Sequence, residues 1–402
     1  MVLPLEGIRV LEFAAGPPVE WACRMLADFG AEVIKVERLP KPKARFSPSR
    51  PSGMIEDDDP EKEEKFKVFD ALNRNKKSIA INLKSEQGRA IFHKLVAMTD
   101  VIVEGFRPGV MKRLQADYKA LKEFNGGLIY CSVTGYGQNT SLDNLVGHDL
   151  NYVSIAGILD LTGTKDGPPV MPGTQVGDWG GASQAVIGIL LALTGRNKNG
   201  QGQHIDISLT DSAVSWLMFL ANEYFATGYV PSRGKNVTTG AAPFNNVFQT
   251  KDRKYITIAC WEQKFYENLC KALGKEEYIP YQDDDGDKRD EILSSFREIF
   301  CTKTRDEWVE LLKDKDICIA PVYDFEESLR NSYARERNYV LKKEHPVLGE
   351  IEQLGIPIKL SETPGQWVSF SPSYGQDTDR ILEKLGFSPK EIDIFHEKRV
   401  VG

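Results

Sequence analysis

The stretch Gly7–Glu37, GIRVLEFAAGPPVEWACRMLADFGAEVIKVE, decides the fold. It begins with a short run of β-favouring residues and passes through a turn that contains glycine and two prolines. Apolar residues at helical spacing follow, and a second β-favouring run ends the stretch. A strand, a helix and a second strand in this order form the unit from which parallel sheets are built. The turn lacks the G-x-G-x-x-G fingerprint, so the stretch does not predict a dinucleotide site.

The same alternation continues downstream. Strand-like runs occur at 77–83, 100–106 and 127–137, and a helical pattern fills 85–99. Repeated strands and helices predict an α/β fold, in which helices cover both faces of an open, doubly wound, Rossmann-like parallel sheet. The sequence contains neither the G-x-x-x-x-G-K-[ST] phosphate loop nor the G-x-S-x-G nucleophile elbow.

Two breaks in composition divide the chain. Residues 36–68 are rich in proline and charge and predict a solvated loop, and residues 228–246 are rich in glycine, proline and asparagine. A β-hairpin that turns at Lys251–Arg253 is expected after the second break. We therefore predict a large domain at 1–208, a linker at 209–246, a small α/β domain at 247–323, a return linker at 324–350, and a C-terminal segment at 351–402 that rejoins the large domain.

Composition excludes several classes of protein. A formal net charge of −7 over 402 residues argues against a nucleic-acid binder. The longest apolar run, 185–195, is too short to cross a bilayer, and the first residues do not resemble a signal peptide, so no membrane partner is expected. The 6 cysteines are scattered and form no C-x-x-C, which predicts reduced thiols in a cytoplasmic protein and no zinc site.

Three residues are candidates for catalysis, and each has a structural alternative. His148 opens an apolar, helix-like run, where it is either a proton acceptor or a neighbour of a capping Asp149. Asp178 lies just before Gly180-Gly181 and an apolar helix, so it either caps that helix or acts beside N–H groups suited to an oxyanion. Glu262 lies between a predicted strand and a helix, as a surface carboxylate or a functional one.

Basic residues gather in the first part of the chain. Most such side chains simply face solvent, but two or three groups brought together by the fold would form a phosphate site. The residues are Lys35, Arg38, Lys41, Lys43, Arg45, Arg50, Arg74, Lys76, Lys77, Arg107, Lys112 and Arg113. Asp28, Glu37 and Asp211 are interpreted as structural charges.

Several segments, taken in order, carry a resemblance to a known family. They include LEGIRVLEFAAGPPVEWACRMLADFGAEVIKVE, LNRNKKSIAINLKSEQGR, DVIVEGFRPGVMKRL, GHDLNYVSIAGIL and VGDWGGAS. With them the chain resembles the superfamily of family III CoA-transferases and α-methylacyl-CoA racemases over nearly its whole length. The resemblance implies a large CoA-binding domain, a small domain and an interlocked homodimer. In that dimer the active site lies between the large domain of one subunit and the small domain of the other.

The resemblance also implies roles for the three candidates. Asp178 matches the aspartate of the superfamily, which is a nucleophile in transferases and an acid/base in racemases. His148 and Glu262 match the histidine and glutamate of the racemase branch. The transferase branch carries a glycine-rich loop near the last of these, whereas ITIACWEQKFYENL contains no glycine. We therefore expect an isomerase that epimerises 2-methylacyl-CoA thioesters in lipid metabolism, with a type III CoA-transferase as the alternative and an inactive CoA-binding protein as a third possibility.

Proton removal beside a thioester carbonyl produces an enolate, so epimerisation needs a proton acceptor on one face and a donor on the other. His148 and Asp178 would supply the two faces, and Glu262 would orient His148. N–H groups at Asp178–Gly181 would hold the enolate oxygen. No metal and no cofactor is expected, because coenzyme A belongs to the acyl-CoA substrate. The resemblance places CoA contacts at Arg38, Leu72, Asn73, Lys76, Gly105, Phe106, Arg107 and Arg113.

Overall fold

A computed structural model describes residues 2–39 and 67–402, and most of the predicted loop at 36–68 lies outside these residues. The chain forms two compact units. Unit 1 comprises Met1–Ala156, Thr174–Trp216 and Tyr333–Gly402, and unit 2 comprises Gly157–Gly173 and Leu217–Ser332. Unit 2 thus includes 157–173, a segment that the sequence places in the large domain. Each unit is described by itself.

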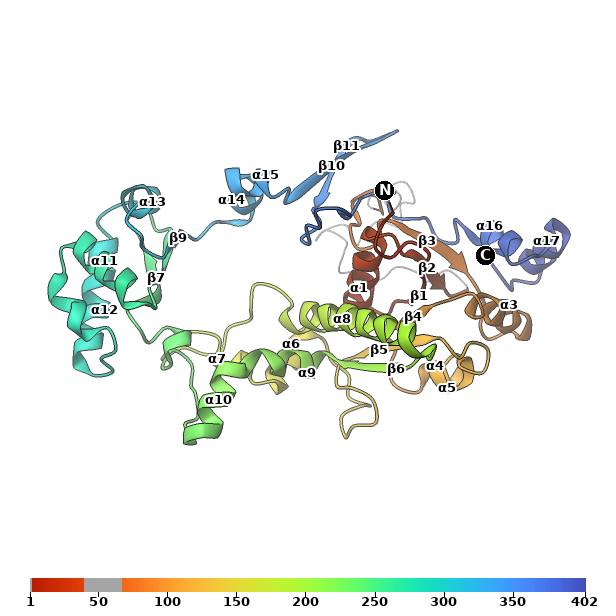
Figure 1. Cartoon of the computed structure of the whole chain (residues 1–402), viewed down its shortest axis with the longest axis horizontal. Coiled ribbons are helices and arrows are strands. Elements are labelled where there is room, and N and C mark those ends of the chain that lie inside the picture. Colours follow the sequence, from red (N-terminus) through yellow and green to blue (C-terminus); the bar gives the residue numbers. More distant parts are fainter. Residues whose placement is uncertain (1, 40–66) are drawn as a thin grey trace. The chain divides into compact units, whose positions relative to one another are not determined.

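The core of unit 1 is a six-stranded sheet in which every neighbouring pair of strands is parallel (Figure 1). Its strands are β1 (Arg9–Phe13), β2 (Glu32–Glu37), β3 (Lys76–Ala80), β4 (Val101–Glu104), β5 (Ile129–Thr134) and β6 (His204–Ser208). Their order, β3-β2-β1-β4-β5-β6, is that of a doubly wound sheet and confirms the predicted fold class. The last strand, β6, was not foreseen.

Helices cover both faces of this sheet. Alternate strand residues contribute to separate apolar cores: Val10, Val33 and Val101 on one face, and Leu11, Ile34 and Ile102 on the other. The first core includes residues of α1 (Pro17–Asp28), α6 (Asp149–Ile155), α8 (Val176–Asn199) and α9 (Leu209–Val214). The second includes residues of α3 (Glu86–Val96), α4 (Val110–Arg113), α5 (Tyr118–Leu121), α16 (Thr378–Lys384) and α17 (Pro389–Glu397).

The C-terminal segment Tyr333–Gly402 belongs to unit 1. A hairpin of β10 (Val340–His345) and β11 (Gly349–Leu354) follows α15 (Ser332–Glu336). Beyond it the chain returns to the edge of the sheet, where α16 packs against β3 and Val401 bridges Ile81 (Figure 1). The C-terminal residues therefore complete an apolar core to which the first strand, β1, also contributes.

The strand order reverses at β1, whose two neighbours in the sheet are β2 and β4. In such sheets, ligands bind at the carboxyl ends of the two strands where the order reverses. Gly105 follows β4 at this place, and its backbone N–H donates to the carbonyl of Phe13 at 3.2 Å. A Cβ atom on Gly105 would lie 2.8 Å from Val19 Cγ2, so only glycine lets the chain pass α1 here.

Helix α8 is a core helix of unit 1. With 24 residues it is long and apolar enough to cross a membrane by length and composition, unlike the shorter apolar run within it. Half of its apolar window is buried, however, and the helix packs against α1, α9 and β5. Packing inside the protein thus accounts for the buried half of this apolar window.

Unit 2 contains a three-stranded antiparallel sheet covered by helices. The strands are β7 (Asn245–Gln249), β8 (Tyr255–Ala259) and β9 (Ile319–Pro321). The hairpin between β7 and β8 turns where the sequence predicts, and Arg253 adopts a φ of 62° there. The helices are α7 (Ile158–Leu161), α10 (Met218–Thr227), α11 (Gln263–Leu273), α12 (Asp287–Phe300), α13 (Arg305–Leu312) and α14 (Phe325–Arg330). Short 3₁₀ turns of this unit occupy Val237–Thr239 and Glu276–Tyr281, and a further one, Ser215–Leu217, lies where the chain passes from unit 1 to unit 2.

Buried ion pairs join distant segments of unit 1. Arg74 is fully buried and donates to both carboxylate oxygens of Asp28, at 3.0 and 2.8 Å, and to the carbonyl of Leu354 at 2.7 Å. The ammonium of Lys76 lies 2.6 Å from a carboxylate oxygen of Glu12, and both side chains are inaccessible to solvent. Asp28 therefore has a structural role, as its sequence context indicates.

We predict that Arg74→Met lowers the free energy of unfolding by about 3 kcal/mol or more, because it leaves Asp28 short of its main partner inside the protein. Denaturant unfolding measures the change. The matched control is Lys342→Met, which removes an exposed pair with Glu350 and should cost less than about 1 kcal/mol. Equal costs for the two variants would contradict the structural role of Arg74.

Candidate active site

His148 lies directly before α6 and occupies its N-cap position. Its backbone N–H donates to Asn151 Oδ1 at 3.0 Å, which fixes the start of the helix. The residue as a whole is exposed to solvent. His148 is therefore held by its main chain while its imidazole ring stays accessible, an arrangement that suits a group that exchanges protons with a ligand.

Asp149, the next residue, links α6 to α8. Its Oδ1 accepts a hydrogen bond of 3.0 Å from the backbone N–H of Asp178, the third residue of α8. The expectation that Asp149 caps its own helix is wrong, because His148 holds the N-cap position of α6 and Asp149 is its first residue. Asp149 caps α8 instead. Gly177 makes this approach possible, because a Cβ atom there would lie 3.2 Å from Asp149 Oδ1. The bond brings the beginnings of the two helices together, and with them His148 and Asp178.

Asp178 is a half-buried carboxyl with a perturbed acidity. Burial, and secondarily the nearby charge of Asp149, raise its pKa to about 7. Tyr152 lies in the same surroundings, and burial together with the charge of Asp178 raises the pKa of its phenol to about 12. The phenol of Tyr152 donates to the carbonyl of Gly147 at 2.5 Å, beside His148. A carboxyl with a pKa near 7 can both donate and accept a proton at neutral pH.

The N–H groups predicted to hold an oxyanion are partly engaged elsewhere. The N–H of Asp178 donates to Asp149, and that of Trp179 donates to the carbonyl of Gln175 at 3.1 Å. Gly180 and Gly181 lie within the helix, where backbone N–H groups bond the preceding turn. The prediction that the N–H groups of Asp178–Gly181 are available to an oxyanion is therefore wrong, because α8 begins earlier in the sequence than expected. The N–H groups of Val176 and Gly177 precede the intrahelical bonds and point to the same end of the helix.

Glu262 belongs to unit 2, at the N-cap position of α11, and it is exposed. It follows β8 by a short connection, as its sequence context predicts. His148 and Asp178 both lie in unit 1, at the starts of two helices that Asp149 links, whereas the proposed contact of Glu262 with His148 stays a prediction.

The predicted CoA contacts differ in their exposure to solvent. Arg38 follows β2, Arg107 follows β4 and Arg113 ends α4, and all three are exposed; Gly105 and Phe106 are half-buried at the end of β4. Asn73 and Lys76 are buried, with exposed fractions of 3% and 4%. The remaining predicted contact, Leu72, is half-buried.

Internal partners engage the buried group. Asn73 donates to Asp70 at 2.7 Å and to Glu20 at 3.2 Å, and Lys76 pairs with Glu12. Lys76 is therefore part of the protein interior, and we exclude its ammonium from the proposed phosphate contacts. The three exposed arginines are suited to phosphate groups by their charge and forked geometry.

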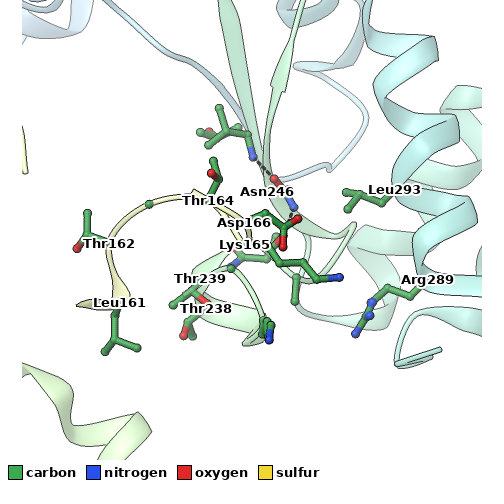
Figure 2. Close-up of a pocket in the computed structure, with 18 of the residues that line it drawn as sticks. Leu161, Thr162, Thr164, Lys165, Asp166, Thr238, Thr239, Asn246, Arg289 and Leu293 are labelled. Atoms are coloured by element: carbon green, nitrogen blue, oxygen red, sulfur yellow. Dashed lines mark hydrogen bonds between the residues drawn. The ribbon is translucent and has the colours of Figure 1, made fainter. Parts of the chain in front are cut away.

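Unit 2 contains a hollow of about 1570 Å³ next to its sheet (Figure 2). Lys165 and Asp166 contribute to its lining from the segment between α7 and α8, and Arg289 from α12. Asn246 is fixed at its wall by a bond from the N–H of Val247 at 2.9 Å. None of the three predicted catalytic residues belongs to this lining. Within residues 2–39 and 67–402, no cluster of His, Cys, Asp or Glu is suited to a metal ion.

Comparisons with known proteins agree with the sheet and the order of the motifs. The chain is 33% identical to α-methylacyl-CoA racemase of Mus musculus, over 99% of this chain and 97% of that protein. It is 30% identical to succinyl-CoA–D-citramalate CoA-transferase of Chloroflexus aurantiacus, over 99% and 98% of the two proteins. The crystal structure of a CAIB/BAIF family protein from Brucella suis superposes with a TM-score of 0.79 at 27% identity, covering 96% of this chain and 100% of that one.

The model of the family described as CoA-transferase family III matches residues 5–378. This match spans both units and includes all three predicted catalytic residues. The chain therefore belongs to CoA-transferase family III, whose relatives here include both racemases and CoA-transferases.

Proposed function

We propose that the protein is a racemase of 2-methylacyl-CoA thioesters that works by two-base 1,1-proton transfer. The observation that carries the proposal is the bond from the N–H of Asp178 to Asp149, because it brings an accessible histidine and a carboxyl with a pKa of about 7 to one place. The free thiols among the described cysteines fit a reducing, cytoplasmic setting.

The proton transfers follow from these two residues. One of the pair, His148 or Asp178, removes the proton from the α-carbon, and the electron pair moves into the thioester carbonyl to form an enolate. The other donates a proton to the opposite face of the same carbon, which restores the carbonyl with inverted configuration. The positive end of α8 would stabilise the enolate oxygen, and Glu262 of the partner subunit would orient His148.

The protein would bind the substrate through its coenzyme A part. Arg38, Arg107 and Arg113 would bind its phosphate groups, and Phe106 would pack against its adenine. Gly105 would let the nucleotide approach the backbone at the carboxyl end of β4. No other cofactor enters this proposal, because the chemistry requires only proton transfer.

The alternative is a type III CoA-transferase, in which the carboxylate of Asp178 attacks a CoA thioester and forms an acyl anhydride. Transferase relatives at 30% identity support it. A nucleophile must be ionised, whereas burial keeps a large fraction of Asp178 protonated at pH 7. This protonated fraction and the accessible His148 favour the racemase.

We further propose that the working form is a homodimer. All residues of α10 escape burial, and Phe219 and Phe225 are 82% and 79% exposed. On α8, Leu191 is 68% exposed. Apolar surface of this extent on two helices fits coverage by a second copy of the chain, in line with the interlocked dimer that the family resemblance implies.

We predict that wild-type protein incubated with (S)-2-methylacyl-CoA in D₂O, with no acceptor acid, incorporates α-deuterium and produces both configurations. His148→Ala and Asp178→Asn should each lower the exchange rate by about 10²-fold or more, because each removes one of the two proton carriers. Mass spectrometry and chiral chromatography measure the outcome.

The control for this experiment is His396→Ala, which alters an exposed histidine paired with Asp379 on the C-terminal helices and should leave exchange unchanged. Absence of exchange together with CoA transfer to an added carboxylic acid, and hydroxylamine-sensitive labelling of Asp178, would establish the transferase instead. Neither reaction, with CoA still bound, would indicate an inactive binding protein.

We predict that Asp149→Asn lowers the pKa of Asp178, since the charge of Asp149 contributes to raising it. Asparagine keeps an oxygen that can accept the N–H of Asp178, so the helix contact survives. Carboxyl ¹³C chemical shifts followed through a pH titration measure the change. Asp160→Asn, an exposed carboxylate of unit 2, is the control and should leave the titration of Asp178 where it is; an unchanged or higher pKa in Asp149→Asn would refute the electrostatic coupling.

We predict that wild-type protein sediments with the mass of two chains, and that Phe219→Glu shifts material toward the mass of one chain. A charge at this position would have to be desolvated in the interface. Val347→Glu, 83% exposed in the turn between β10 and β11, is the control and should not change the mass. A monomeric wild-type protein would contradict the dimer.

A further inference from the structure

Glu104 is a buried carboxyl at the carboxyl end of β4. It is 3% exposed, and it is the last residue of the strand, next to β1 at the place where the strand order reverses. Its Oε2 accepts a hydrogen bond of 2.9 Å from the backbone N–H of Phe106. The carboxyl therefore bends the chain after the strand and fixes the direction in which Phe106 and Arg107 leave the sheet.

A row of polar side chains on the neighbouring strands β5 and β6 lies in register with this carboxyl. Ser132 of β5 pairs in register with Glu104 and with Asp206 of β6, and its hydroxyl bonds the carboxyl of Glu104. The hydroxyl of Ser132 also lies 3.0 Å from Nε2 of His204. At the far end of the row, Asp206 accepts from the N–H of Gln138 at 2.9 Å. Glu104 and Asp206 thus each accept a backbone N–H from the loop that follows a strand at the carboxyl edge of the sheet.

We propose that Glu104 is a positioning residue for coenzyme A, whose carboxylate holds the Gly105–Arg107 turn in the conformation that receives the nucleotide. The inference rests on the proposed CoA site and deepens it. Glu104 itself does not touch the ligand; it acts through the backbone N–H of Phe106 and so through the placement of the Phe106 ring and the Arg107 guanidinium.

Because the carboxyl of Glu104 titrates, its proposed role leads to a specific pH dependence of CoA binding. Burial raises the pKa of Glu104 to about 7, against the hydrogen bonds from Ser132 and Phe106, which lower it. Above pH 7 the group is a carboxylate, a strong acceptor for the N–H of Phe106; below pH 7 it is protonated and a weaker acceptor. The affinity for CoA should therefore be highest above pH 7 and fall as the pH drops through this value.

Other groups near Glu104 set the position of this transition. The charge of Asp206 raises the pKa of Glu104. Tyr130 on β5 lies within the field of the carboxyl, and burial keeps its phenol protonated. His204 is a further titratable group of this row; burial lowers its pKa, and the charge of Asp206 acts in the opposite direction.

The experiment is calorimetric titration of the full-length protein with free CoA at pH values on both sides of 7. Wild-type protein should lose roughly tenfold in affinity on going from above to below the transition. Glu104→Gln keeps a carbonyl acceptor at every pH, so this component should vanish. The phosphates of CoA also titrate, with a pKa of about 6, but alike in both proteins, and the difference between the two profiles isolates Glu104.

Two further variants move the transition in opposite directions. Ser132→Ala removes a bond to the carboxylate and should raise the midpoint, whereas Asp206→Asn removes a nearby negative charge and should lower it. A wild-type protein that binds CoA with the same pH profile as Glu104→Gln, or shifts of the wrong sign in both variants, would overturn the proposal while leaving the CoA site intact. Failure of the wild-type protein to bind CoA at any pH would overturn the CoA site itself, and this inference with it.

Discussion

The hydrogen bond from the N–H of Asp178 to the carboxylate of Asp149 is the interaction on which the proposed chemistry depends. It joins helices that are distant in sequence, and it satisfies an N–H group that the first turn of α8 cannot pair by itself. The same carboxylate adds to the burial that raises the pKa of Asp178. One short polar contact thus links the helix starts that carry His148 and Asp178 and contributes to the raised pKa of Asp178.

The basic residues of unit 1 have two kinds of role. Arg74 and Lys76 neutralise buried carboxylates and hold α1, β1 and the segment before β3 in place. Arg38, Arg107 and Arg113 remain exposed and are the members of the predicted phosphate cluster that can meet a ligand. Because a buried charge without a partner is costly, the first kind of role tolerates substitution poorly, whereas the second affects binding without endangering the fold.

Local pattern in the sequence was enough to predict the strands β1 to β5 and the hairpin of unit 2, because periodicity and turn residues act over short distances. Motif resemblance likewise singled out His148 and Asp178, whose catalytic roles stay predictions. Neither could show that Asp149 caps α8 or that Lys76 turns inward to Glu12, since both depend on segments that only the folded chain brings together. The helix start of α8 was misplaced for a related reason: Gly180 and Gly181 suggest a turn, yet close packing against Trp216 and Leu209 requires glycine inside the helix.

The closing of unit 1 by its C-terminal segment has a consequence for the order of synthesis. On the ribosome, the sheet and all of unit 2 emerge before α16 and α17, which cover the β3 edge. Until the last residues appear, Ile79 and Ile81 have no cover from Val400 and Val401, and they are fully buried only afterwards. During synthesis, the apolar side chains of β3 therefore lack the cover from α16, α17, Val400 and Val401 that they have in the folded unit 1.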